Sequence, residues 1–534
     1  MKRQRHLLIF FVLAFFPFIS QAEYEFFAGG ELNLGAGSGD FAPFYLRTNR
    51  HGKLTQSKNA QLDIWAQDTL DHSKRFDFSW GIEAMGGYAS RVNYYKFEGQ
   101  VDANGNAIFE KNPQGPSAVW LQQLYGEVKW RSLFLSLGLK DRDSFFVDQE
   151  LSSGDLLWSG NSRAIPEARI GFIDFQKVPL TKGWLEIDAC ISYGKFVDTG
   201  WIKSHFNYWW GKMNPGSFWT YKRISFRSDA SKPLMGQFGF QMSGIFGGWT
   251  YKYYGGKETE RTDNYGGFKD FFLMILPINS GSHEGYKTGD HKGTWDIALR
   301  YRFKQGESLR AYTQWFWDDG SGLLKQNRAD GLWGLEFKTG RRWWITGAVV
   351  EYLDLTNMSG PISYAPSYNN TNGANLPYHV NGRDGYYNNF YYRSYVNYGL
   401  NMGTPMVMGT LFNTGYEDSE NKDHSKLLWN NGEIPYFRVR SLHLAVEGAI
   451  GPDIDYIVKY SHRKAWGTTN SYALLKPVSA DSFMVGASYR LSGIPGMTIN
   501  AAFGFDKGNM PMDAFGVLAG VSYQIPVVIK GKRK

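Results

Sequence analysis

The sequence predicts an all-β fold, a transmembrane antiparallel β-barrel of about 18 strands with long extracellular loops. One short apolar segment stands at the N-terminus, and no later apolar run approaches the roughly 20 residues that a spanning helix needs. Ribbons in which apolar and polar residues alternate recur from Tyr24 to Pro526. About ten such residues suffice for a tilted strand with one face in lipid and the other in a polar lumen.

The first element, residues 1–22, has the pattern of a cleavable signal peptide. Three basic residues precede the apolar residues 7–19, and Ser20 and Ala22 are small residues at the two positions that a signal peptidase inspects. The apolar stretch is too short for a retained spanning helix. We therefore expect cleavage after Ala22 and secretion to the bacterial outer membrane.

Composition favours one long barrel domain over residues 23–529, followed by a basic tail over residues 530–534. Aromatic residues make up 17% of the chain and charged residues only 20%, while the mean hydropathy of −0.40 is too low for a helical membrane protein. A soluble secreted enzyme of this length would normally divide into several domains, but no helical block or linker interrupts the ribbons. The lone Cys190 excludes an intrachain disulfide framework.

The net charge of +8 lies almost entirely at the two ends of the chain. The signal segment and the tail hold seven of the eight positive charges, in Lys2, Arg3, Arg5, Lys530, Lys532, Arg533 and Lys534. Nucleic-acid binding needs a basic patch on a folded face. The sequence therefore predicts no nucleic-acid partner. The predicted barrel itself implies contact with outer-membrane lipid.

Alternation can be followed ribbon by ribbon along the chain. In residues 184–196 one face is apolar or aromatic and the other is polar or small, and residues 294–303 repeat the pattern. Further alternating apolar positions are Phe76, Phe78, Trp80, Ile82, Ala84, Ile454, Tyr456, Val458 and Tyr460. A soluble sandwich alternates as well. The barrel is favoured because Arg300, Arg302 and Arg310 fall on the face opposite the large aromatic residues.

Tryptophans near the expected strand ends predict aromatic girdles at the level of the lipid headgroups. The residues assigned to these girdles are Trp120, Trp130, Trp315, Trp317, Trp343 and Trp344. Tight hairpins are expected at residues 129–132, 303–307, 338–341 and 451–453, and long loops at 91–118, 140–166, 197–217, 254–291, 355–403 and 413–434. Since short turns of such barrels face the periplasm, the long loops should lie outside the cell.

Several segments resemble the Wzi-type capsule-assembly proteins of the outer membrane. The main resemblance lies in residues 151–172, with Ser152, Ser153 and Gly154, then Ser159, Gly160 and Asn161, then Ile165 and Pro166. Other matching segments follow in order: Pro43-Phe44-Tyr45-Leu46, Asn49-Arg50-His51-Gly52, Leu124-Tyr125-Gly126-Glu127, Leu137-Gly138-Leu139-Lys140, Val350-Glu351-Tyr352-Leu353, Ser359-Gly360-Pro361, Asp384-Gly385-Tyr386-Tyr387-Asn388-Asn389 and Gly403-Thr404-Pro405.

The resemblance implies a non-enzymatic, lectin-like barrel that binds capsular or extracellular polysaccharide and helps to attach or assemble capsule at the cell surface. It also leaves room for other capsule-export components as partners. Some members of the family carry an N-terminal periplasmic helical bundle, for which the strand-like residues 24–34 leave no room. Loops would then have to close the pore. The glycines and Pro166 suit a folded turn, and a loop that packs the barrel mouth is favoured over direct ligand contact.

Two expected outer loops carry the residues that sugar recognition needs, because pyranose rings stack on flat aromatic faces and their hydroxyls bond planar polar groups. One loop, residues 205–212, offers Trp209 and Trp210. The other, residues 381–393, offers Arg383, Tyr386, Tyr387, Asn388 and Asn389. Arginine suits the carboxylates of uronic acids. Anchoring in the lipid interface is the competing interpretation of these aromatic residues.

Catalytic and metal motifs are absent from the sequence. It lacks a Gly-x-Ser-x-Gly elbow, a His-Glu-x-x-His helix and a Walker loop. His283 and His291 lack zinc spacing, and the acidic pairs Asp318-Asp319 and Asp453-x-Asp455 are typical of turns. We expect no enzyme activity, cofactor or metal. A diffusion porin or polysaccharide channel, and an outer-membrane hydrolase built from distant strands, remain the alternatives.

Overall fold

The computed structural model describes residues 24–264, 266–275, 289–318, 320–325, 327–358, 370–371, 374–375, 385–415, 430–467 and 473–529. The expected signal peptide and basic tail, together with Arg383, lie outside these residues. No helix in the described part is long and apolar enough to cross a membrane.

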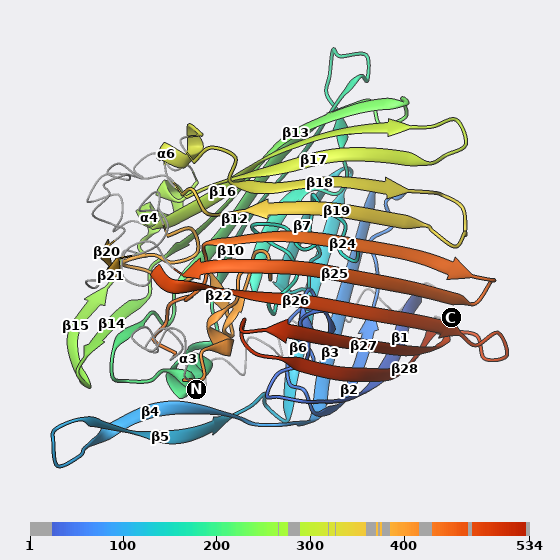
Figure 1. Ribbon diagram of the computed structural model, residues 1–534. Coiled ribbons are helices and arrows are strands. Elements are labelled where there is room, and N and C mark those ends of the chain that lie inside the picture. Colours follow the sequence, from blue (N-terminus) through green and yellow to red (C-terminus); the bar gives the residue numbers. More distant parts are fainter. Residues whose placement is uncertain are drawn as a thin grey trace, which may run out of the picture.

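The chain forms a closed antiparallel barrel of 18 strands, with one short extra strand (Figure 1). Each wall strand pairs with the next one along the chain, and β1 pairs with β28 to close the barrel. The wall strands are β1 (Tyr24–Gly37), β2 (Asn59–Gln67), β3 (Phe76–Ala89), β6 (Val119–Trp130), β7 (Leu133–Leu139), β8 (Glu167–Phe172), β10 (Leu185–Lys195), β12 (Phe218–Ser228), β13 (Leu234–Phe246), β16 (Asp290–Arg302), β17 (Ser308–Trp317), β18 (Gly331–Lys338), β19 (Gly347–Asp354), β24 (Val439–Ile450), β25 (Ile454–Gly467), β26 (Ala473–Arg490), β27 (Met497–Gly508) and β28 (Ala514–Ile529). The extra strand β9 (Gln176–Lys177) pairs with β10 beyond the end of β8. The predicted fold class is confirmed.

Short turns and long loops separate to opposite ends of the barrel, as predicted (Figure 1). Two residues join β6 to β7, and three join β24 to β25. Both ends of the sheet, Tyr24 and Ile529, lie at the short-turn end, where they pair with each other. One expected hairpin, 338–341, is longer than predicted, because β19 begins only at Gly347.

The alternating faces of the strands take the predicted sides of the wall. In β10 the polar or small residues Glu186, Asp188, Cys190 and Ser192 are buried in the lumen, while their neighbours are half exposed on the outside. Trp130, Trp343 and Trp344 lie exposed at the short-turn end, in agreement with a girdle.

Two of the predicted girdle tryptophans, Trp317 and Trp120, do not lie in a girdle, and Trp317 is fully buried. Trp315 is half buried on the outer face of β17 at the long-loop end, where the ammonium group of Lys325 lies 4.1 Å from its ring centre. Trp120 lines a cavity among the long loops and bonds to Gln122 within its own strand. The irregular register between β3 and β6 explains the inward position of Trp120. An extra residue in a strand turns the side chains beyond it to the opposite face of the sheet.

The long loops contain the remaining elements. They are α2 (Phe44–Arg47), β4 (Val92–Val101), β5 (Ala107–Gln114), α3 (Thr199–His205), β11 (Gly211–Met213), β14 (Trp249–Tyr254), β15 (Lys257–Asp263), α4 (Phe268–Leu273), α6 (Gly320–Leu323), β20 (Asn370–Thr371), β21 (Ala374–Asn375), β22 (Val396–Asn397), β23 (Leu400–Asn401) and the 3₁₀ turn η3 (Thr410–Phe412). The hairpins β4–β5 and β14–β15 extend beyond the barrel wall (Figure 1).

The largest buried cluster lies inside the barrel, between the wall and loops that fold inward. Leu151, Leu156 and Leu157 of the 140–166 loop have no exposed surface, and neither do Met402 and Met406 of the loop that follows β19. Loops therefore fill much of the lumen.

Candidate functional site

The family-like loop, residues 151–166, is fixed to the barrel wall through Glu351 of β19. The carboxylate of Glu351 accepts hydrogen bonds from the Ser152 hydroxyl and the Ser153 backbone N–H, both at 2.6 Å, and from the Tyr312 hydroxyl. All four residues are buried. A hydrogen bond to a charged group contributes roughly 1.5–3 kcal/mol, so Glu351 is a major anchor of the loop.

The second half of the same loop joins segments that are far apart in the sequence. The Ser159 hydroxyl donates to the Gly403 carbonyl at 2.7 Å, and the Asn161 amide donates to the Asn401 carbonyl at 2.9 Å. The His51 backbone N–H donates to the carbonyl of Gly160. The family-like segments at residues 49–52, 350–353 and 403–405 therefore contact the 151–166 loop.

The glycines of the loop have the backbone conformations expected of a folded turn. Gly154 and Gly160 have φ of +117° and +68°, and a Cβ on Gly154 would lie 2.7 Å from Pro405. Pro166 immediately precedes β8 and accepts a backbone bond from Lys195. The interpretation of this loop as a packing element at the barrel mouth agrees with these positions.

Asp155 forms the polar centre of the loop. One of its oxygens accepts from Gln314 at 2.9 Å and from Gln241 at 3.3 Å, and both glutamines also bond Asp296 on the wall. Its other oxygen accepts the backbone N–H groups of Leu157 and Trp158. Burial raises the pKa of Asp155. This set of bonds joins the loop to three wall strands.

A cavity of about 420 Å³ opens at the long-loop end, above these packed segments. Its lining comes from the β1–β2 loop, the segment before β6, Arg163, α3 and the segment 398–411. The residues that can contact a ligand there include Thr55, Gln56, Gln61, Tyr94, Trp120, Arg163, Asp198, Trp201, Ser204, His205 and Tyr398. We call this space the outer cavity.

Arg163 presents a cation in the outer cavity. Its guanidinium carbon lies 4.4 Å from the ring centre of Tyr398 and 5.7 Å from that of Trp120. One nitrogen donates to the Leu121 carbonyl at 2.9 Å, and in the described part of the chain no carboxylate forms an ion pair with Arg163. Burial lowers the pKa of Arg163, but an arginine remains charged at neutral pH. The group is thus positioned to bind an anion.

Trp201 and His205 of α3 form an aromatic side of the cavity. Their rings are stacked, with centres 4.1 Å apart, and Tyr94 packs edge-on against His205. Burial lowers the pKa of His205 to about 4. His205 is therefore neutral at physiological pH, so Arg163 remains the main positive charge of this lining.

Two further polar groups complete the outer cavity. Asp198 is buried and forms a two-pronged ion pair with Arg393, with contacts of 2.9 and 2.6 Å, so its charge is balanced. Gln61 of β2 is also buried, and its carbonyl oxygen has no hydrogen-bond partner among the described residues. An unpaired buried acceptor is costly.

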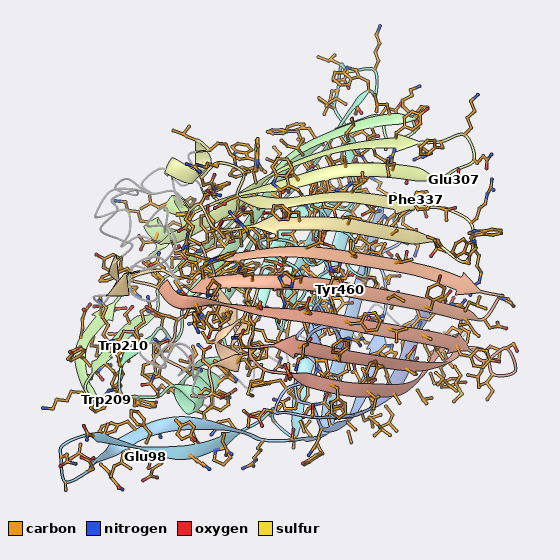
Figure 2. The ribbon with its side chains drawn as sticks, in the orientation of Figure 1. Glu98, Trp209, Trp210, Glu307, Phe337 and Tyr460 are labelled. Atoms are coloured by element: carbon orange, nitrogen blue, oxygen red, sulfur yellow. The ribbon has the colours of Figure 1, made fainter. Side chains whose placement is uncertain are left out.

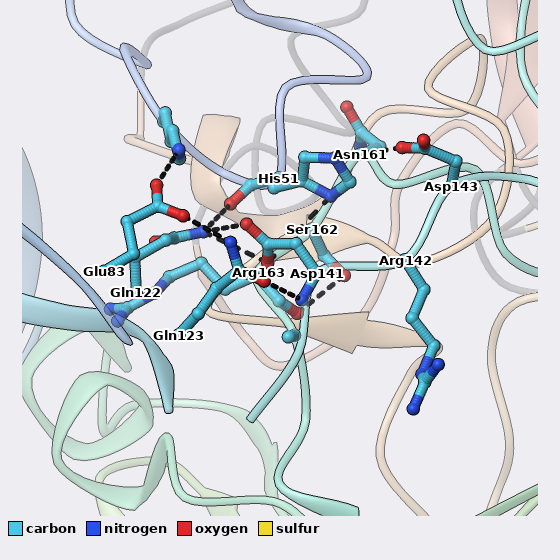
Figure 3. Close-up of polar contacts among 12 residues, drawn as sticks. His51, Glu83, Gln122, Gln123, Asp141, Arg142, Asp143, Asn161, Ser162 and Arg163 are labelled. Carbon is cyan, nitrogen blue, oxygen red and sulfur yellow. Dashed lines mark hydrogen bonds and ion pairs between the residues drawn. The ribbon is translucent and has the colours of Figure 1, made fainter. Parts of the chain in front are cut away.

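An ionic network around His51 and Asp141 lies beside Arg163 (Figure 3). His51 lies 3.3 Å from Asp143 and 4.0 Å from Asp141. Burial alone would lower the pKa of His51, but its bond to Asp143 and the charges of both aspartates outweigh burial and raise it. Gln122 donates both to Asp141 and to the carbonyl of His51. The network fixes residues 51 and 141 beside Trp120 and Arg163.

Trp209 and Trp210 lie at the long-loop end, opposite Glu307 in a short turn (Figure 2). Trp209 packs against Phe97 and Phe109 of the β4–β5 hairpin, with ring centres 4.8 and 5.9 Å away. Both tryptophans are half buried and line neither of the two large cavities. The contacts of Trp209 give it a part in holding the hairpin.

The second predicted sugar loop is a packed element. Tyr386 and Tyr387 have no exposed surface; the Tyr386 hydroxyl donates to Asp330, and that of Tyr387 donates to the Leu156 carbonyl. Asn388 bonds the backbone of Ile434, and Asn389 bonds Asp290. The prediction that the two tyrosine rings stack on a sugar is corrected, because the loop turns inward and buries both rings.

Sequence reasoning missed Trp120, Arg163, Trp201 and Tyr398 as candidate ligand contacts. Its position near a strand end predicts a girdle role for Trp120. Arg163, Trp201 and Tyr398 belong to neither of the two aromatic loops that the sequence predicts as sugar-binding. Only the approach of four separate loops brings them together. A weak signal was present in the family-like segment itself, where Arg163 directly follows Ser159–Ser162.

A second cavity, of about 490 Å³, lies inside the barrel toward the short-turn end. Its charged lining residues are Glu31, Arg50, Glu150, Glu447, Asp455 and Lys459. We call it the inner cavity. Within the described residues, no group of three or more His, Cys, Asp or Glu side chains could hold a metal ion.

Comparison with known proteins supports the fold. No family model and no curated protein matches the chain. The chain is similar to a solved structure described as Wzi, an outer-membrane protein involved in group 1 capsule assembly in Escherichia coli and a carbohydrate-binding β-barrel. The identity is 12% and the TM-score 0.53, over 93% of this chain and 83% of that one. The chain has the fold of an outer-membrane β-barrel.

Weaker likenesses extend to other solved structures. OccAB4 of Acinetobacter baumannii and OccK5 of Pseudomonas aeruginosa are each 10% identical to the chain, with TM-scores of 0.42. The alignments cover 96% and 94% of this chain and 100% and 98% of theirs. The fold supports a location in the outer membrane. At these identities the likenesses indicate no particular ligand, and the family resemblance seen in the sequence remains a resemblance.

Proposed function

We propose that this protein binds an acidic extracellular polysaccharide in its outer cavity and helps to attach or assemble capsule at the cell surface. The observation that supports the proposal is the Arg163 guanidinium, which has no carboxylate partner among the described residues and lies beside aromatic rings in a cavity of about 420 Å³. The rings suit the apolar faces of pyranoses, and the guanidinium fork suits a carboxylate.

The proposed role is binding without catalysis. The inward loops are fixed to the wall through Glu351 and Asp155, so the outer cavity rests on a rigid base. The carbohydrate-binding description of the Wzi structure is consistent with this proposal but belongs to that protein.

The test is equilibrium binding of purified protein to an acidic capsular polysaccharide and to the same polymer after reduction of its carboxyl groups. Arg163→Gln should weaken binding of the acidic polymer by roughly 10- to 100-fold, the loss expected for one charge-assisted hydrogen bond. It should change binding of the reduced polymer little.

Arg261→Gln provides a matched control. Arg261 also lies over aromatic rings, 5.0 Å from Trp249 and 5.2 Å from Tyr251, but on the exposed β15 hairpin outside the cavity. The proposal would fail if both variants bound the acidic polymer as tightly as the wild-type protein does.

A diffusion porin is the second candidate, and the charged inner cavity is the observation that favours it. A porin should give steady conductance in planar bilayers. Polysaccharide binding at the outer cavity predicts little conductance, because inward-folded loops fill much of the lumen.

A further inference from the structure

Two cations lie directly opposite each other on the outside of the barrel. Arg440 of β24 and Lys464 of β25 are register partners, and both side chains are exposed. Like charges at opposed positions of neighbouring strands destabilise a sheet. This placement therefore calls for a compensating anion.

The protein supplies only part of that compensation. Arg440 lies 2.9 Å from Asp354, its register partner on β19, but in the described part of the chain Lys464 has no carboxylate partner. Both cations lie over the ring of Trp466, at 5.6 and 5.4 Å from its centre. The positive charge of Lys464 is therefore not balanced by a carboxylate of the described residues. The same surface carries Trp466, and tryptophan is enriched at membrane interfaces.

The pair lies at the long-loop edge of the apolar band. Below Arg440, the outward residues of β24 include Leu442, Leu444 and Ile450, all exposed. His462 and Asp481, which pair at 3.0 Å, lie in the same row as Leu442, one row below the two cations. The cations therefore face the membrane at the height of the headgroups in the outer leaflet.

We infer that Arg440, Lys464 and Trp466 form a binding site for the phosphorylated headgroup of an outer-leaflet glycolipid such as lipid A. A phosphate between the two cations would neutralise the unpaired charge and accept hydrogen bonds from both side chains. The Trp466 ring, next to Lys464 toward the long-loop end of β25, would pack beside the bound headgroup. This inference is independent of polysaccharide binding in the outer cavity.

The test is native mass spectrometry of the detergent-solubilised protein titrated with diphosphoryl lipid A. A double variant, Arg440→Gln with Lys464→Gln, should lose about fivefold in affinity for each cation removed, or about 25-fold in total. The matched control is Lys74→Gln with Lys507→Gln, which removes two exposed cations that pair with Asp77 and Asp513 elsewhere on the protein. The control should bind as the wild type does.

Two further arms identify the group that is bound. Dephosphorylated lipid A should bind the wild-type protein as weakly as diphosphoryl lipid A binds the double variant. Inorganic phosphate at millimolar concentration should not displace the lipid. The inference would be overturned if the double variant bound diphosphoryl lipid A as tightly as the wild type does. It would also be overturned if the wild-type protein bound dephosphorylated and diphosphoryl lipid A equally well. Full displacement of the lipid by inorganic phosphate would contradict it too, because that result would indicate a site for free anions. Resistance of all variants to unfolding in cold SDS checks that each barrel is folded.

Discussion

Gly52 shows how one residue determines the geometry of the outer cavity. Its φ is +73°, and a Cβ there would lie 2.6 Å from Cγ of Arg163 and 3.1 Å from its backbone nitrogen. The missing side chain leaves the space through which the stem of Arg163 passes. Glycine at this position is therefore a requirement of the proposed binding site as well as of the turn.

We predict that Gly52→Ala weakens acidic polysaccharide binding about tenfold, because the added methyl group displaces Arg163. The strain of an alanine at positive φ should cost roughly 1 kcal/mol or more of stability. Binding assays and thermal unfolding in detergent measure the two effects. Gly306→Ala is the control, since Gly306 also has a positive φ, of +100°, but no atom lies within 4 Å of the position that its Cβ would take. An equal loss of polysaccharide binding in both variants would contradict the role given to Gly52.

His51 gives the base of the cavity a pH dependence with a definite sign. Its pKa is raised in the folded protein, chiefly by Asp143 and Asp141 and against the effects of burial and Lys53. The stabilisation is therefore complete below the unfolded pKa of about 6.5 and is lost as the pH rises through the raised folded value. We predict that His51→Gln lowers the unfolding temperature more at pH 5.5 than at pH 9. An equal difference at both pH values would show that the ring does not titrate as described.

At the scale of elements, the inward loop 140–166 depends on a few wall residues. Glu351 accepts three hydrogen bonds in a buried position. Glu351→Ala leaves these donors without their acceptor, and we predict a loss of roughly 3 kcal/mol or more of stability together with higher conductance in planar bilayers.

Glu110→Ala is the control for this prediction, since Glu110 is exposed on the β5 hairpin and bonds only Gln100 in the described structure. Glu110→Ala should change neither the stability nor the conductance. A Glu351→Ala protein with wild-type stability and no added conductance would show that Glu351 does not hold the loop.

The strands could be predicted from the sequence, whereas the binding surface could not. Alternation is a local property, so β10 and β16 follow from their own residues. The outer cavity forms where loops far apart in the sequence meet, and no local pattern joins Gln61, Trp120, Arg163 and Trp201. Sugar contact by Tyr386 and Tyr387 is wrongly predicted for the same reason. The composition of an aromatic loop does not determine whether the loop turns outward or into the lumen.

At the scale of the whole molecule, the barrel is an outer-membrane fold whose loops divide its interior into two spaces. The outer cavity lies among the long loops, and the inner cavity lies toward the short turns. The packed segments between them lie around Leu151 and Tyr45.

The most direct test is a structure of the protein bound to uronate-containing oligosaccharides released from the surface polysaccharide. The account predicts a sugar ring in the outer cavity against Trp201 or Tyr398, with its carboxylate on Arg163. An oligosaccharide found in the inner cavity, or threaded through the lumen past Glu351, would contradict the account and favour a channel.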